Sequence, residues 1–155
     1  MAQVVPRTLS LNVFDDELLS RSRSGTVWGR IYFELGGDFF PDPGWSDMTV
    51  AFSDAWLSAL MQIASTRSKT ERVYFMDGPF SVVIHSERSG LVQVDLLHET
   101  SVKHSARVSL EQALKDAISV CERLISICHA HNWTNDRDYL RLIATLASAL
   151  KQTGR

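Results

Sequence analysis

Histidine and cysteine are the side chains in this sequence best suited to bind a metal or exchange a proton. The histidines are His85, His98, His104, His129 and His131. The last two are only two positions apart, and on a helix side chains at this spacing do not share a face. Neither a C-x-x-C nor an H-E-x-x-H motif is present. The pattern therefore predicts no metal site and no cofactor.

Nucleophilic catalysis needs an activated thiol or hydroxyl, and the sequence offers no pattern for one. Cys121 and Cys128 lie in a stretch with helical periodicity, which places them about 10 Å apart along the axis. That separation excludes an internal disulfide, and thiols on an apparent core face are unreactive. There is no G-x-S-x-G elbow, and Gly36-Gly37 lacks the lysine of a phosphate loop. We therefore predict that the protein is not an enzyme.

Charged residues are segregated along the chain. Residues 31–66 contain five acidic residues and no lysine or arginine, although the whole chain has 16 basic and 18 acidic residues. The loop predicted within this interval is also rich in aromatic residues. Charge steers a basic partner toward such a surface, and desolvated aromatic side chains hold it there. The predicted partner-binding residues are Asp38, Phe39, Phe40, Asp42, Trp45, Asp47 and Asp77.

Two other interpretations of these residues stay open. In one, the acids solvate a loop and cap a helix, while the aromatic side chains fill the core beneath a sheet. In the other, Asp47 and Asp77 form the carboxylate site of a small enzyme, because both lie beside turn-forming residues, where functional groups are often found. A pocket that joins the two carboxylates would support that enzyme, and packed structure between them would exclude it.

Strand-forming and turn-forming residues divide the first two thirds of the chain. Alternating, β-branched and aromatic residues predict strands over residues 8–14, 26–35, 47–52, 72–76, 80–85 and 91–97. Polar residues 15–25 and the glycine- and proline-rich residues 36–44 predict loops. Asp77-Gly78 predicts a two-residue hairpin turn, with Pro79 at the start of the returning strand. Ser53 is expected to cap a helix over residues 53–64.

Helical periodicity dominates the last third of the chain. Ser109 followed by Gln112 is a capping-box pattern, and it predicts a helix that reaches Cys128. A second helix is predicted from Thr134 or Asn135. The apolar face predicted for it is Leu140, Ile143, Ala147 and Leu150. The order of elements predicts an α+β fold: an antiparallel or mixed sheet of about five or six strands, with three helices, two of them C-terminal, packed mainly on one face.

Length and composition set the remaining expectations. With 155 residues, 45% of them apolar, the chain has the size of one domain, spanning residues 1–155. It contains neither an apolar run long enough for a membrane span nor the apolar stretch of a secretion signal, so we expect a cytoplasmic protein that binds no membrane. A pI of about 6.2 without an extended basic patch argues against a nucleic-acid partner. A homo-oligomer is left open.

Two short motifs rich in aromatic residues stand out. The first reads Phe40-Pro41-x-Pro43-Gly44-Trp45-x-Asp47 and is followed by Trp56, and the second reads Phe75-Met76-Asp77-Gly78-Pro79-Phe80. The C-terminal helical pair adds Cys128 and then Asn132-Trp133. Together these stretches resemble small bacterial proteins that confer immunity to polymorphic or contact-dependent growth inhibition toxins. The resemblance covers most of the chain, and its motifs are not catalytic.

The resemblance implies a cognate inhibitor without turnover of its own. Such a protein binds a toxin domain, often over the active site, and many of these toxins are basic nucleases, which would suit the acidic interval. This last step is analogy, because immunity proteins share no single fold. Besides the small enzyme, the remaining alternative is a structural or assembly subunit, which a large exposed apolar patch would favour.

Overall fold

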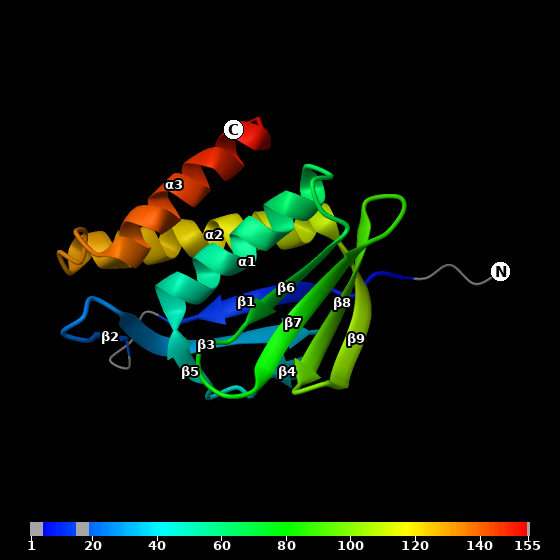
Figure 1. Ribbon diagram of the computed structural model, residues 1–155, viewed down its shortest axis with the longest axis horizontal. Coiled ribbons are helices and arrows are strands. Elements are labelled where there is room, and N and C mark those ends of the chain that lie inside the picture. The colour runs from blue at the N-terminus through cyan, green and yellow to red at the C-terminus, as the bar shows by residue number, and fades with distance from the viewer. Residues whose placement is uncertain (1–4, 15–18, 155) are drawn as a thin grey trace.

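The computed structural model describes residues 5–14 and 19–154 and shows three helices above two sheets (Figure 1). Residues 15–18 of the predicted loop 15–25 lie outside the described residues. The elements follow in the order β1 (Leu9–Val13), β2 (Ser20–Arg21), β3 (Val27–Leu35), β4 (Asp38–Phe40), β5 (Ser46–Met48), α1 (Thr49–Ala64), β6 (Thr70–Tyr74), β7 (Phe80–Ser86), β8 (Leu91–His98), β9 (Ser101–Ser109), α2 (Leu110–Ala130) and α3 (Arg137–Gln152).

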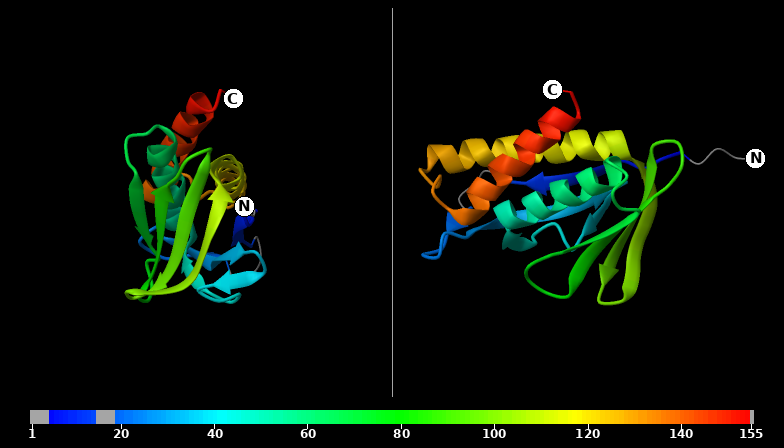
Figure 2. Two further views of the ribbon diagram at one scale, coloured as in Figure 1. Left: turned by 90° about the vertical axis from the view of Figure 1, so that its right-hand side faces the viewer. Right: turned by 45° about the horizontal axis from the view of Figure 1, so that its top comes forward.

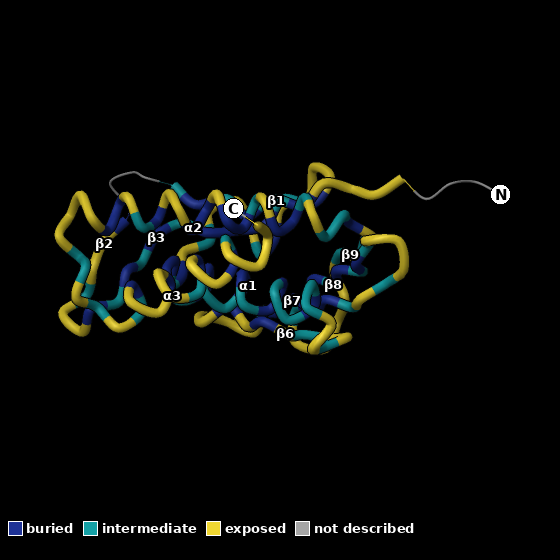
Figure 3. Tube along the Cα trace, turned by 90° about the horizontal axis from the view of Figure 1, so that it is seen from above, coloured by how far each residue is buried: buried dark blue, intermediate teal, exposed yellow. Residues whose placement is uncertain are grey.

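The strands form two antiparallel sheets. β3 is the centre of the first sheet, where β1 and β4 pair with its C-terminal half and β2 and β5 with its N-terminal half. The second sheet is a meander in the order β6-β7-β8-β9. All three helices lie on the same side of the two sheets, and α3 is the outermost (Figures 1 and 2). Seen from above, the outer turns of α3 are exposed (Figure 3).

Aromatic side chains join both sheets to α1 in one core. Phe52 of α1 stacks on Phe75, which follows β6, with ring centroids 4.2 Å apart. Phe33 of β3 meets the Trp56 ring of α1 edge-on at 4.9 Å. Each such pair adds about 0.5–1.5 kcal/mol beyond the burial of its surface. The buried apolar residues of the sheets and the helices belong to one continuous cluster.

The predicted fold class is confirmed, and the sheet organisation differs from the prediction. The fold is α+β with antiparallel strands and three helices, two of them C-terminal. However, the described residues contain nine strands in two sheets rather than five or six in one. β9 was not predicted, because most of its residues are polar and exposed. β4 lies inside the predicted loop 36–44, where Gly36 and Gly37 adopt positive φ in the turn from β3.

Two local predictions around α1 and β6 are wrong. α1 begins at Thr49, so Ser53 is a buried residue of its second turn and not the cap. Asp77 and Gly78 belong to a longer turn, because Phe75 donates to the Phe80 carbonyl at 3.0 Å across the four intervening residues. That closing bond leaves too many residues between the strands for a two-residue hairpin.

The two C-terminal helices lie at the predicted positions in the sequence, but the buried face of α3 differs from the predicted one. Ser109 caps α2 as predicted and accepts the N–H of Gln112 at 3.2 Å. α3, however, buries Tyr139, Leu142, Leu146 and Ala149. Two residues of the predicted apolar face, Leu140 and Ile143, are instead 54% and 39% exposed. The face is rotated by about one residue, because contacts with α1 and α2 select it.

The two cysteines of α2 are free and buried. Burial raises the pKa of the Cys128 thiol to about 11, and the charge of Asp136 adds to the shift. Burial also raises the pKa of Cys121, with contributions from nearby acids. Neither thiol is therefore activated as a nucleophile at neutral pH.

Side chains of α2 occupy the outer edge of β1. The Gln112 amide accepts the N–H of Leu9 at 3.3 Å and donates to the Leu9 carbonyl at 3.1 Å. Four residues further along, Asp116 accepts the N–H of Leu11 at 2.8 Å. Residues four apart lie on one face of a helix. α2 therefore binds β1 much as a neighbouring strand would.

The same arrangement continues to the end of β1. The Arg123 guanidinium donates to the Val13 carbonyl. Burial raises the pKa of the Asp116 carboxyl above its ordinary value, although the bond from Leu11 and the charge of Arg123 oppose the shift. Unpaired groups on an edge strand invite pairing with other chains. Here four of the outward groups of β1 bond to the protein's own helix: both groups of Leu9, the N–H of Leu11 and the carbonyl of Val13.

Candidate functional site

Asp47 is the most heavily bonded of the predicted site residues. It is the middle residue of the short strand β5 and is 0% exposed. One of its oxygens accepts the N–H groups of Met48 at 2.7 Å and Met76 at 3.1 Å. The other accepts the Trp45 indole N–H and the backbone N–H of Asp77, both at 3.1 Å. Four donors satisfy a carboxylate that would otherwise be costly to bury.

These bonds join two loops that are distant in the sequence. We call residues 41–45 and residues 76–79 together the loop platform. The Trp45 ring lies against Phe80 with ring centroids 4.9 Å apart. A Cβ atom on Gly78, which has φ of +73°, would lie 2.9 Å from the same indole ring. Gly78 is therefore required both by its backbone conformation and by the close approach of Trp45.

The loop platform presents only some of the predicted side chains to solvent. The predicted residues Asp42 and Asp77 are exposed, and so is Met76, which was not among the predicted residues and is 46% exposed. Asp42 also accepts the N–H of Gly44 at 2.8 Å, which fixes the turn within its own loop. Trp45 is half-buried beneath these residues. The platform is thus a rigid base with two carboxylates and one thioether on its surface.

Two predicted contact residues are wrong because they lie in the interior. Phe40 is 2% exposed and packs against the rings of Phe75 and Phe80 at 6.1 and 5.6 Å. Asp47 is enclosed by the four donors described above. Strand alternation explains the first case, since neighbouring residues of β4 point to opposite faces: Phe39 is 42% exposed, and Phe40 points into the core. Asp47 is buried because N–H groups from two loops use its carboxylate as their acceptor.

The acidic interval is less negative at its surface than its composition indicates. Asp38 lies 3.8 Å from the Arg7 guanidinium and 3.6 Å from the His104 ring. Asp54 accepts a hydrogen bond from Thr145 of α3. With Asp47 buried, the exposed carboxylates on the loop platform are those of Asp42 and Asp77.

The structure does not support a catalytic pair of Asp47 and Asp77. Asp47 has no exposed surface, and each of its oxygens already accepts two N–H groups. Asp77 contributes its backbone N–H to Asp47 and turns away into solvent. A general acid or base must reach a proton on the substrate. The arrangement instead braces the backbone.

A polar network that was not predicted crosses the outer face of the second sheet. The His85 ring bonds to Thr70 through Nδ1 at 3.3 Å and to Asp95 through Nε2 at 3.2 Å. Asp95 also accepts the Ser105 hydroxyl at 2.6 Å and the Gln93 amide at 3.2 Å. The network joins all four strands. Its sequence signal was the polar residues at alternate positions of residues 85–105, but β9 had to be known to align them.

The order of hydroxyl, imidazole and carboxylate invites comparison with a catalytic triad. Desolvation raises the pKa of the Asp95 carboxyl, but hydrogen bonds from Ser105, Gln93 and His85 outweigh it and hold the pKa below its ordinary value. None of the cavities described below includes Thr70 or His85. A nucleophile needs a substrate pocket and donors for an oxyanion beside it. We therefore assign the network to cross-strand pairing.

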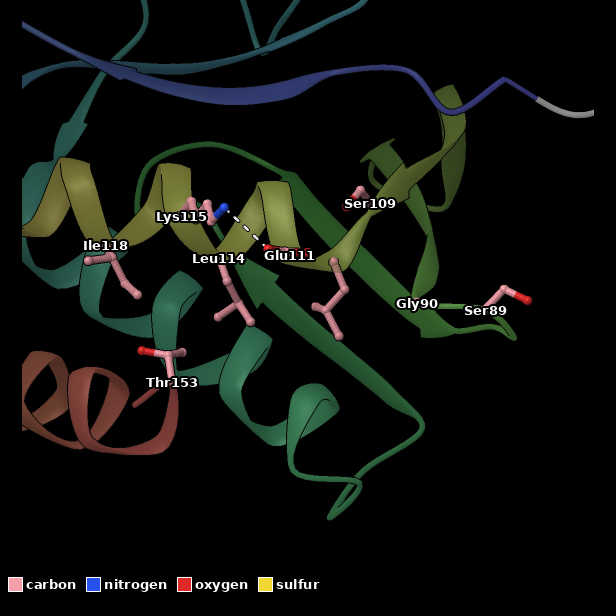
Figure 4. A pocket seen from close by; sticks show the side chains of 9 residues that line it. Ser89, Gly90, Ser109, Glu111, Leu114, Lys115, Ile118 and Thr153 are labelled. Carbon is pink, nitrogen blue, oxygen red and sulfur yellow. Dashed lines mark ion pairs between the residues drawn. The ribbon is translucent and has the colours of Figure 1, made fainter. Parts of the chain in front are cut away.

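Two cavities beside the C-terminal helices hold no reactive cluster. One of about 460 Å³ lies between the start of α2, the turn before β8 and the end of α3 (Figure 4). Leu114 and Ile118 form its apolar side, and Lys115 pairs with Glu111 on its rim at 3.2 Å. The other, of about 590 Å³, lies between α1 and α3 and is mostly polar. Neither contains a predicted site residue.

The described part of the chain contains neither a metal-binding cluster nor a membrane-spanning helix. No group of three or more histidine, cysteine, aspartate or glutamate residues there is placed to hold a metal ion. None of the helices that the structure describes is both long enough and apolar enough to cross a bilayer.

Comparison of the chain with protein-family models, curated proteins and solved structures found no match. The resemblance to immunity proteins is therefore a prediction from the short motifs alone. Residues 40–47 and 75–80 lie side by side, joined by Asp47 and Trp45.

Proposed function

We propose that this protein binds and neutralises a cognate bacterial toxin domain, a basic nuclease, through the loop platform. The observation that carries the proposal is the Asp47 brace, which joins both resembling motifs into one surface. A surface fixed before binding loses little conformational entropy on association. Asp42, Met76 and Asp77 are therefore held in place for a partner.

The exposed groups of the platform suit a basic protein surface. The carboxylates of Asp42 and Asp77 attract lysine and arginine during the encounter. Met76 supplies an adaptable apolar contact between them. Inhibition requires only that the toxin's active site be covered, so the protein needs no reactive centre of its own.

The test is co-expression with the toxin domain encoded by the adjacent gene. We expect protection of cell growth and co-elution of the two proteins in size-exclusion chromatography. The double variant Asp42→Lys/Asp77→Lys is expected to weaken the complex at least about tenfold, because it places like charges against a basic partner. Glu122→Lys is the matched control, since Glu122 is exposed on α2 away from the platform.

Two results would count against the proposal. If the wild-type protein neither protects cells nor co-elutes with the toxin domain, the immunity function is wrong. If the complex forms but the double variant binds as tightly as Glu122→Lys, the toxin binds elsewhere and the platform is not the site.

One observation favours an assembly subunit as the second candidate. Leu140 and Ile143 are exposed one turn apart on the outer face of α3. An apolar pair of this kind suits a contact between copies. Light scattering at increasing protein concentration tests the alternative. A stable oligomer that Leu140→Glu disrupts would support it, whereas a monomer at all concentrations would exclude it.

A further inference from the structure

β6 is an edge strand of the second sheet and, among the described residues, pairs only with β7. Phe75, just beyond its end, donates to the Phe80 carbonyl at 3.0 Å and so faces β7. In an antiparallel pair, successive residues turn their backbone groups to alternate sides. The N–H and C=O groups of Arg72 and Tyr74 therefore point away from β7, toward the outside of the sheet.

Two side chains limit this outward edge to a short stretch. At one end the Ser68 hydroxyl donates to the Thr70 carbonyl at 2.8 Å, and at the other Asp47 accepts the N–H of Met76 at 3.1 Å. Between them, no described residue bonds to the outward backbone groups. We call these groups of residues 72 and 74 the open edge. They offer two donors and two acceptors in the geometry that an added strand uses.

A groove of about 480 Å³ lies between the open edge and α1. Its lining residues are Asp54, Ala55, Ser58, Ala59, Glu71, Arg72, Val73, Tyr74 and Met76. The residues from α1 have short side chains, which leave space beside β6. A paired strand needs such space, because its axis lies about 4.8 Å from its neighbour. Tyr74, which is 60% exposed, adds apolar surface along the same edge.

The charges around the groove select the kind of strand that fits. Asp54 and Glu71 place carboxylates on its two walls. The Arg72 guanidinium is directed to the other face of the sheet, where it lies 5.8 Å from the Tyr74 ring centroid and 3.4 Å from the Ser81 hydroxyl. The groove side is therefore acidic, and lysine or arginine on a bound strand would complement it.

A second copy of this chain does not fit the open edge. Two-fold pairing of β6 with itself would bring Asp54 and Glu71 toward the same carboxylates of the other copy. Like charges at such a contact oppose association. The groove therefore favours a chemically different chain.

We propose that the open edge accepts an extended, basic segment of the partner protein as a fifth strand of the second sheet. The segment would turn lysine or arginine toward Asp54 and Glu71 and smaller side chains toward Arg72 and Tyr74. The identity of the partner as a toxin rests on the function proposed above, but the strand addition itself does not. The open edge ends where the loop platform begins, at Met76, so one partner can contact both.

A synthetic peptide tests the strand addition without the toxin. The probe is a short acetylated peptide in which lysine alternates with valine or threonine. Titration into the ¹⁵N-labelled full chain is expected to shift the amide signals of Arg72 and Tyr74 and to slow their hydrogen exchange. The same peptide with glutamate for lysine is expected to bind at least about tenfold more weakly. Equal binding of both peptides would overturn the charge argument.

N-methylated peptides make the test specific for backbone pairing. In an antiparallel fifth strand, which matches the pairing of the rest of the sheet, the residues that bond to the open edge share the outer face with Arg72 and Tyr74, whereas the lysines face the groove. Methylation of the valine and threonine amides is expected to abolish binding, and methylation of the lysine amides is expected to preserve it. If both methylated peptides bind, or if neither does, the geometry of the proposal is wrong.

Substitutions in the protein give the reciprocal test. Tyr74→Pro removes one outward N–H and is expected to weaken peptide binding at least about tenfold relative to Tyr74→Ala, which keeps that N–H. If Tyr74→Pro fails to fold, Asp54→Asn combined with Glu71→Gln serves instead, with the same expected loss for the lysine peptide. Unchanged binding in either folded variant would overturn the proposal.

The outcomes separate this inference from the proposed function. If the protein neutralises the toxin but neither peptide nor toxin perturbs Arg72 and Tyr74, the proposed function stands and the strand addition is wrong. If the protein binds the lysine peptide at β6 but does not protect cells, the strand addition stands and the immunity function is wrong. Self-association that shifts the same two amides would identify a second copy as the occupant and overturn the proposal.

Discussion

The outer edge of β1 is covered by a helix, whereas the outer edge of β6 in the same protein is open. Both strands begin a sheet, both have five residues, and both turn alternate backbone groups outward. At β1 four of these groups bond to Gln112, Asp116 and Arg123 of α2. At β6 side chains reach only the two ends, and the groups of Arg72 and Tyr74 stay unbonded within the described structure.

The difference shows that a helix can close a sheet edge only where its side chains are long enough and correctly spaced. α2 presents an amide, a carboxylate and a guanidinium on one face. α1 presents alanine and serine toward β6, so a groove remains there. Open edges are hazardous because they promote aggregation. An edge strand that stays open although a helix lies beside it is therefore a candidate binding site.

The largest effect is expected from Asp47, which closes the end of the open edge. Asp47→Ala leaves four N–H groups without their acceptor, three of them on the backbone of Met48, Met76 and Asp77. We expect a loss of about 3–5 kcal/mol in the free energy of unfolding, measured by urea denaturation. Asp42→Ala is the control, and a comparable loss there would show that the brace has no special role.

Opening the closed edge is expected to have the next largest effect. Asp116→Leu leaves the Leu11 N–H without a partner and should cost about 1–3 kcal/mol. Asp116→Asn keeps an acceptor oxygen and should be much closer to wild type. We also expect Asp116→Leu to self-associate at high concentration, which sedimentation velocity would detect. Equal stability of the two variants would show that closure of β1 contributes little.

The two sheets should also respond to pH with opposite signs. The folded pKa of Asp95 is lowered, so its contribution to stability is present above its ordinary value and is lost as pH falls through the folded pKa. The folded pKa of Asp116 is raised, so its contribution is present below its ordinary value and is lost as pH rises through the folded pKa. In Asp95→Asn, the free energy of unfolding is expected to depend less on pH in the acid range than it does in the wild type.

For Asp116→Asn, the weaker pH dependence is expected on the other side, between the ordinary and the raised pKa. Both effects should be smaller than the losses predicted for Asp47→Ala and Asp116→Leu. If each variant keeps the wild-type pH dependence, the two carboxyls do not titrate in the way that their surroundings indicate.

The smallest expected effect is a difference in hydrogen-exchange rate between the two edges, which is measured in the wild-type protein. The amides of Leu9 and Leu11 are expected to exchange slowly, because side chains of α2 hold them. The amides of Arg72 and Tyr74 should exchange much faster than that of Val73, which faces β7. Slow exchange at both outward positions of β6 would show that this edge is already occupied.

The elements that sequence predicts well are those with strong periodicity. β3 and α2 combine long apolar patterns with clear ends, and their boundaries lie close to the prediction. β9 was missed, because an edge strand with a polar outer face lacks that pattern. The face of α3 was misassigned, since Tyr139 and Leu142 compete with Leu140 and Ile143 at nearly equal apolarity. Only contacts with α1 and α2 decide between them.

The candidate site was predicted only in part, for a different reason. Asp42 and Asp77 are exposed beside Trp45, as the loop composition indicated. The role of Asp47 depends on the N–H groups of Met76 and Asp77, which come from a loop far along the chain. A local pattern identifies an acidic residue beside aromatic ones. It does not tell whether distant amides will bury that residue.

The closure of β1 by α2 also orders events during synthesis. Leu9 and its partner Gln112 are separated by 103 positions, so β1 leaves the ribosome long before the side chains that protect it. Until then its outward groups are open to neighbouring nascent chains or to chaperones. Contacts of such long sequence separation also slow folding, because a large loop must close first. The synthesis of α2 thus also ends the time during which this edge is exposed.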